Sequence, residues 1–84
     1  MDEEKILSEL GRRIRAQRKS IGLTQEQLAL VAEVDRSYFG AIERGERNVT
    51  FTVLYRLCLA LRCDIALLTG ELPPTKVADQ FLVQ

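Results

Sequence analysis

Four side chains that favour helix N-termini divide most of the chain into short helices. Thr24 and Gln27 form a capping box, in which the threonine hydroxyl accepts from a free backbone N–H and the glutamine side chain reaches back. Asp35, Thr50 and Asp64 are residues of the same capping kind, and each stands directly before an apolar stretch with helical spacing. Because these capping residues follow one another at intervals of 11 to 15 residues, the helices between them can be only about two to three turns long. The chain must therefore pack several short helices across one another.

The pattern predicts five helices and no strand of useful length. The first helix spans residues 2–21 and stops at Gly22, and Gly45 and Gly70 stop two others. The Pro-Pro pair at residues 73–74 ends the regular structure, and the tail that follows can form one more helical turn. The later predicted helices span residues 25–32, 36–44, 51–61 and 65–69.

Apolar residues at helical spacing predict which face of each helix is buried. The fourth helix has the strongest pattern, and it places Cys58 in the core as a small apolar side chain with no redox role. The predicted inner faces are Leu7, Leu10, Ile14 and Ile21 in the first helix, Leu28, Ala29 and Ala32 in the second, and Phe51, Leu54, Leu57, Cys58 and Leu61 in the fourth.

Length and composition exclude several classes of protein. The 84 residues allow one domain, and the absence of histidine and of a Cys-x-x-Cys pair argues against a zinc site. No nucleophile stands beside a recognisable base, so we expect no enzyme activity, no metal and no cofactor. No signal peptide or membrane span is recognisable, which predicts a reduced, cytoplasmic protein.

The charge of the chain is zero overall but unevenly distributed. Residues 11–62 carry ten Lys or Arg against five Asp or Glu, a net charge of +5, whereas residues 1–10 carry −3 and residues 63–84 carry −2. A basic middle segment can face an acidic partner such as nucleic acid while the acidic ends face elsewhere. This weak charge signal agrees with the pattern of residues 25–44.

Residues 25–44 have the anatomy of a helix-turn-helix. Two short capped helices are separated by a turn of three to four residues, and the second begins with exposed side chains that can form hydrogen bonds. In such modules the second helix enters the major groove of DNA by its N-terminal end.

The same segment, QEQLALVAEVDRSYFGAIER, resembles the Xre family of phage and bacterial regulators, which contains the lambdoid repressors. Ala29 falls where the family requires a small residue at the helix crossing, and Val34, Phe39 and Ile42 fall at its core positions. The resemblance covers roughly residues 10–70. Residues 35–38 and 42–48 are also similar to the controller proteins of restriction–modification systems, although other family members share these motifs. Glu33 and Arg62 stand where the family often has glycine, which predicts left-handed backbone there.

The resemblance implies an all-α, five-helix, lambda-repressor-like DNA-binding domain over residues 1–72, followed by a tail over residues 73–84. It implies a transcription regulator that binds double-stranded DNA at a palindromic operator as a homodimer. An antitoxin that binds a toxin and represses its own gene is the alternative, and RNA polymerase is a further candidate partner.

Roles for individual residues follow from their matching positions. Arg36 suits bidentate contact with guanine, although a phosphate contact or a solvated side chain is the alternative. Ser37 can form a hydrogen bond with a base edge or with a phosphate. Tyr38 either faces the DNA or covers the helix junction. Gly40 costs helix stability, which suggests close packing against DNA or another helix. The predicted base contacts are Arg36, Ser37, Tyr38 and Ala41, and the predicted backbone contacts are Thr24, Gln25, Arg47 and Asn48.

Two further predictions concern the domain itself and its partner copy. By the resemblance, Arg18 and Glu43 form a partly buried ion pair between the first and third helices. The fifth helix carries more apolar residues than it can bury, which predicts a dimer interface at Ile65, Leu67, Leu68 and Leu72. Tyr55 and Leu59 form a second apolar strip, which can seat a partner or be covered by Phe81 and Leu82 of the tail.

Overall fold

The computed structural model describes residues 2–72, and these form five α-helices and no strand, as predicted. The fold class is thereby confirmed for the described residues. The tail from residue 73, including its predicted helical turn, lies outside them. The helices are α1 (Glu3–Ser20), α2 (Gln25–Ala32), α3 (Arg36–Glu43), α4 (Phe51–Leu61) and α5 (Ile65–Thr69).

All four predicted caps are present. Thr24 and Gln27 form the capping box in both directions, with Thr24 Oγ1 accepting from the Gln27 N–H at 3.1 Å and Gln27 Oε1 accepting from the Thr24 N–H at 2.9 Å. The side chains of Asp35, Thr50 and Asp64 each accept from the backbone N–H three residues later at 3.0–3.2 Å. The helix starts predicted from the sequence are therefore correct.

Helices α1 to α4 all end in the same way, with one left-handed residue. Gly22 and Gly45 adopt φ +78°, and Glu33 and Arg62 adopt φ +60° and +59°. After each, the next N–H returns to a carbonyl five residues back, as in Val34 N–H to Ala29 O at 2.9 Å. The prediction of left-handed Glu33 and Arg62 is confirmed, at a cost of about 1 kcal/mol for each non-glycine residue.

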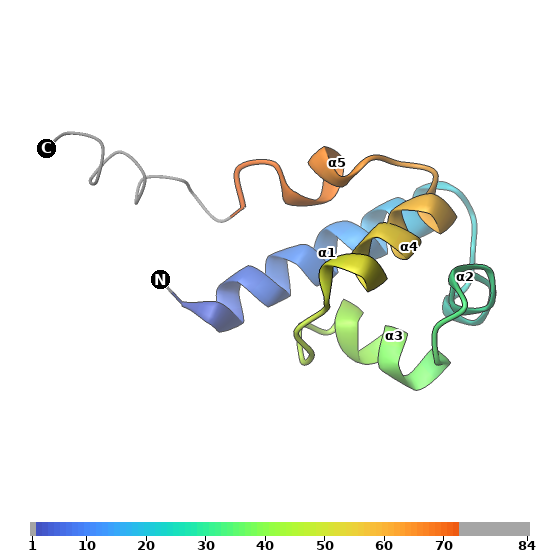
Figure 1. Ribbon diagram of the computed structural model, residues 1–84, viewed down its shortest axis with the longest axis horizontal. Coiled ribbons are helices and arrows are strands. Elements are labelled where there is room, and N and C mark those ends of the chain that lie inside the picture. The colour runs from blue at the N-terminus through green and yellow to red at the C-terminus, as the bar shows by residue number, and fades with distance from the viewer. Residues whose placement is uncertain (1, 73–84) are drawn as a thin grey trace, which may run out of the picture.

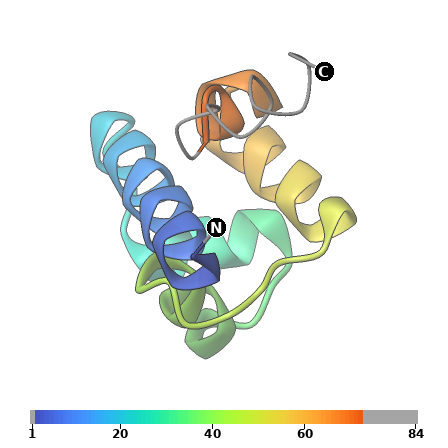
Figure 2. The same cartoon turned by 90° about the vertical axis from the view of Figure 1, so that its left-hand side faces the viewer.

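Helix α1 contacts α3, α4 and α5. Helix α2 packs on α3 and α4. In both views α3 and α5 lie on opposite sides of the molecule (Figures 1 and 2). The outward face of α3 is therefore separated from α5 by the core.

The core gathers side chains from all five helices, and the predictions for Leu7 and Phe51 are wrong. Leu7 is only half-buried and does not pack against the buried cluster. Phe51 is 68% exposed, because it lies on the same face of α4 as Tyr55 and Leu59, which are also exposed. The buried face of α4 starts at Leu54 instead. The buried apolar residues are Leu10, Ile14, Leu28, Ala29, Ala32, Phe39, Ile42, Leu54, Leu57, Cys58, Ala60, Leu61 and Leu68.

Cys58 is 2% exposed and lies in this core, as predicted. Burial, with a smaller effect of Cys63, raises the pKa of the Cys58 thiol to about 11. At neutral pH the thiol is therefore protonated and poorly nucleophilic, as expected for a structural cysteine.

Polar side chains of α1 hold the C-terminal ends of α4 and α5. The Arg13 guanidinium donates to the carbonyls of Gly70 at 2.7 Å and Leu68 at 3.2 Å, and the Gln17 amide donates to Leu61 O at 2.9 Å. These bonds satisfy carbonyls that have no partner within their own helices. Among residues 2–72 no helix combines the length and apolarity that crossing a membrane requires.

Candidate nucleic-acid interface

The crossing of α2 and α3 fixes the direction in which α3 projects. Ala29 is buried at this crossing, and Phe39 and Ile42 anchor α3 from beneath. Asp35 caps α3 through the Tyr38 N–H, so the helix begins directly after the turn. The first turn of α3 is left at the surface.

The four predicted base-contacting residues lie on this surface. Arg36 and Ser37 are exposed, and Tyr38 and Ala41 are half-buried. The structure therefore places all four on α3 but leaves only the first two fully accessible. Exposed hydrogen-bonding groups at the start of a helix are what major-groove readout needs.

Arg47 lies against Tyr38, a contact that the sequence did not predict. Its guanidinium carbon is 5.1 Å from the centre of the tyrosine ring, which is within the range of a cation–π contact. Arg47 and the neighbouring Asn48 are exposed in the loop that follows α3. The loop thus presents a cation beside α3, held in place by the tyrosine ring.

The side chain of Gln25 is turned inward, toward the C-terminal end of α3. Gln25 Nε2 donates to Glu43 Oε1 at 2.9 Å, because the N-terminus of α2 lies beside the C-terminal end of α3. The backbone N–H of Gln25, in the first turn of α2, is the group that remains for a phosphate. Thr24 uses its N–H and accepts with its hydroxyl in the cap, so only its hydroxyl proton is left to donate.

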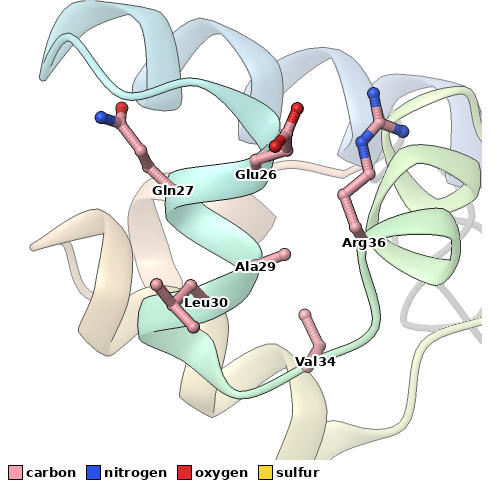
Figure 3. Close-up of a pocket in the computed structure, with 6 residues that line it drawn as sticks. All are labelled: Glu26, Gln27, Ala29, Leu30, Val34 and Arg36. Atoms are coloured by element: carbon pink, nitrogen blue, oxygen red, sulfur yellow. The ribbon is translucent and has the colours of Figure 1, made fainter.

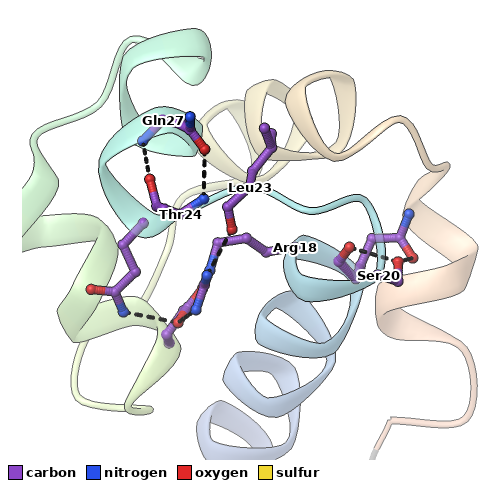
Figure 4. A network of polar contacts seen from close by, with 8 residues as sticks. Arg18, Ser20, Leu23, Thr24 and Gln27 are labelled. Atoms are coloured by element: carbon purple, nitrogen blue, oxygen red, sulfur yellow. Dashed lines mark hydrogen bonds and ion pairs between the residues drawn. The ribbon is translucent and has the colours of Figure 1, made fainter.

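Beneath this surface, Arg18 and Glu43 form the ion pair between α1 and α3 (Figure 4). Arg18 Nε lies 2.6 Å from Glu43 Oε2 and Nη2 lies 3.1 Å from Oε1, while Nη1 donates to Leu23 O at 2.9 Å. The two side chains are 9% and 2% exposed. Buried charges are tolerated when two hydrogen bonds join the ion pair and the other N–H groups of the arginine also have acceptors, as they do here.

Two glycines bring α1 onto the end of α3: Gly45, predicted only as the stop of α3, and Gly11, which the sequence analysis did not single out. A Cβ at Gly11 would collide with Glu43 O and lie 2.6 Å from Ile42 O, and one at Gly45 would lie 2.8 Å from Ser8 Cα. Both positions require close approach of two backbones. A glycine inside a helix pattern was the available signal at Gly11.

An open groove of about 510 Å³ runs between α2 and the start of α3 (Figure 3). Ala29, Leu30 and Val34 form its apolar floor and wall, and Glu26 and Arg36 stand at its rim. The Arg36 side chain points away from Val34, toward the end of the groove where Glu26 lies (Figure 3). The groove therefore leaves the start of α3 accessible from the α2 side.

The residues predicted for a dimer interface differ in exposure, and the prediction for Leu68 is wrong. Leu67 is 53% exposed, and Ile65 and Leu72 are half-buried. Leu68 has no exposed surface because it faces the core, so it has no side-chain surface to offer a partner. In addition, residues 2–72 contain no cluster of three or more side chains suited to holding a metal ion.

Comparison with known proteins agrees with this geometry. A helix-turn-helix family model matches residues 14–68. Control protein C.SmaI of Serratia marcescens is 42% identical over 65 residues, which cover 77% of this chain and 74% of that protein. The immunity repressor of Bacillus phage phi105 is 40% identical over 62 residues, covering 74% of this chain and 43% of the repressor. The crystal structure of the restriction–modification controller protein C.AhdI from Aeromonas hydrophila superposes with a TM-score of 0.73 at 42% identity, covering 74% of this chain and 94% of that one.

Proposed function

Because the chain belongs to the Xre-type helix-turn-helix family of DNA-binding transcription regulators, we propose that it binds a palindromic operator sequence-specifically as a homodimer. The observation that carries this proposal is the first turn of α3, where Arg36 and Ser37 are exposed on a helix anchored by Phe39 and Ile42. The basic segment from residue 11 to residue 62 supplies the attraction to phosphate.

The side chains divide between reading bases and contacting the backbone. Arg36 reads a guanine through two N–H donors, with Ser37, Tyr38 and Ala41 beside it on α3. The backbone is contacted by Thr24, the Gln25 N–H, Arg47 and Asn48, which fix the register without reading sequence.

Replacing Arg36 and Arg47 separately tests this division. Arg36→Ala should reduce discrimination at one base pair of each half-site by about 1–3 kcal/mol. Arg47→Ala should weaken binding to all duplexes alike and reduce the slope of log affinity against log salt by about one unit per protomer. Both effects are measured by titrating cognate and single-substituted duplexes at several salt concentrations. Wild-type behaviour of both variants on every duplex would contradict the assignment.

One α3 helix contacts too few base pairs to select a site in a genome, which is why we propose a dimer. We assign its interface to the apolar strip of α4 that consists of Phe51, Tyr55 and Leu59. These three side chains follow each other at intervals of four residues and are all more than half exposed. A row of large apolar side chains on one helix is typical of a surface that meets a partner.

Sedimentation equilibrium at micromolar concentration tests the dimer and its interface. We expect Leu59→Glu to convert a wild-type dimer to a monomer, because the interface cannot bury an unpaired carboxylate. Leu67→Glu on α5 is the matched control and should leave the dimer intact. Dissociation by Leu67→Glu alone would place the interface on α5. A wild-type monomer, with and without operator DNA, would contradict the dimer itself.

A further inference from the structure

Gly40, in the middle of α3, lies under the ends of three polar side chains. A Cβ at this position would be 3.3 Å from Nη1 of Arg36, 3.3 Å from Nη1 of Arg44 and 3.7 Å from Oε1 of Gln25. Gly40 is buried although it faces the same side of α3 as Arg36, because these side chains cover it. A Cβ at this position would thus require the two guanidinium groups to give way by a few tenths of an ångström.

The two arginines differ in what else holds them. Arg44 Nε lies 3.1 Å from Glu46 Oε2, so one end of its guanidinium is paired on the loop side. Within residues 2–72, no carboxylate lies within ion-pair distance of Arg36. No ion pair among these residues therefore defines the position of the Arg36 side chain, and its Nη1 lies over Gly40.

Gln25 is oriented so that it favours this arrangement. Because its Nε2 donates to Glu43, its Oε1 is turned toward Gly40, on the side of α3 where the two guanidinium groups lie. An acceptor placed there offsets the repulsion between two nearby cations. The buried Arg18–Glu43 pair thereby fixes Gln25, and Gln25 faces the arginines.

We propose that Gly40 is a positioning residue for Arg36: the missing side chain lets the Arg36 guanidinium lie back along α3, and this sets the base pair that Arg36 reads. The proposal rests on the proposed DNA-binding function. A methyl group at residue 40 would be closer to both Nη1 atoms than side chains ordinarily approach, so the guanidinium groups must move. They are the flexible ends of long side chains, so the helix itself is not disturbed.

Gly40→Ala is the direct test, because it changes no charge and favours the helix. Discrimination is measured as the ratio of affinities for the cognate duplex and for a duplex substituted at the base pair read by Arg36. We expect Gly40→Ala to reduce that ratio about three- to tenfold, part of the roughly 5- to 150-fold that a bidentate arginine supplies. Discrimination at base pairs not read by Arg36 should be unchanged. The thermal unfolding midpoint should be equal to or above that of the wild type.

A double-mutant cycle separates positioning from simple crowding of the DNA. In an Arg36→Ala background, Gly40→Ala should have no further effect on discrimination, because the group that it displaces is gone. An equal loss of affinity on all duplexes, or a loss that persists without Arg36, would overturn the proposal. If Arg36→Ala itself leaves discrimination intact, the proposed function fails as well. If Arg36→Ala acts as expected and Gly40→Ala does not, only the positioning role fails.

Discussion

Replacing Arg18 with methionine is expected to lower the free energy of unfolding by about 3–5 kcal/mol. The change leaves the Glu43 carboxylate 2% exposed and without its cation, while α1 and α3 lose the bidentate link between them. A domain of this size is stable by only about 5–10 kcal/mol, so the variant should stand near the limit of folding. Urea unfolding followed by circular dichroism at pH 7 measures the loss.

The matched control replaces both members of the pair. The variant Arg18→Met with Glu43→Met has no lone buried charge, so it should recover most of the stability that Arg18→Met alone loses. Glu43→Gln keeps the size of the side chain, but it puts an amide –NH₂ where a carboxylate oxygen accepts from Arg18 and leaves the Arg18 charge unpaired, so it should also be destabilising. A loss below about 1 kcal/mol for Arg18→Met would mean that the pair does not hold the helices together.

Gly11→Ala is the second change with a large expected effect. Alanine ordinarily favours a helix over glycine by about 1 kcal/mol, but here the methyl group would collide with the carbonyls of Ile42 and Glu43. These are backbone atoms at the end of α3, so relief requires the two helices to separate. We expect a net loss at or above the upper end of the 1–3 kcal/mol range for overpacked sites, measured by the same urea titration.

Gly40→Ala is the matched control for Gly11→Ala, because both replace a buried glycine within a helix. At Gly40 the new methyl group meets only the flexible ends of arginines, so stability should rise by up to about 1 kcal/mol. Opposite signs for the two substitutions would support the close approach of α1 to α3. Equal effects would contradict it.

Most of the fold was predictable because its signals are local. Caps at Thr24, Asp35, Thr50 and Asp64 act within three residues, so the sequence alone locates the helix starts. The left-handed turns at Glu33 and Arg62 followed from the family resemblance. Phe51 was misplaced because a single apolar residue at a helix start fits either of two neighbouring faces.

The parts of the site that were missed depend on contacts between distant residues. Gln25 meets Glu43 and Gly11 meets the end of α3 only after three helices have packed, and neither contact leaves a periodic signal. The contact between Arg47 and Tyr38 likewise depends on how the loop after α3 folds back. The sequence therefore predicted which residues lie at the surface of α3 better than how they are held.

Selection of bound duplexes from a random pool tests most directly whether α3 reads a specific DNA sequence. The wild-type protein should enrich one palindromic motif whose half-sites are centred about 34–36 Å apart, with a conserved guanine in each half-site. Selection with Arg36→Ala should enrich the same motif without preference at that guanine. Enrichment of no motif from the random pool would contradict sequence-specific reading by α3.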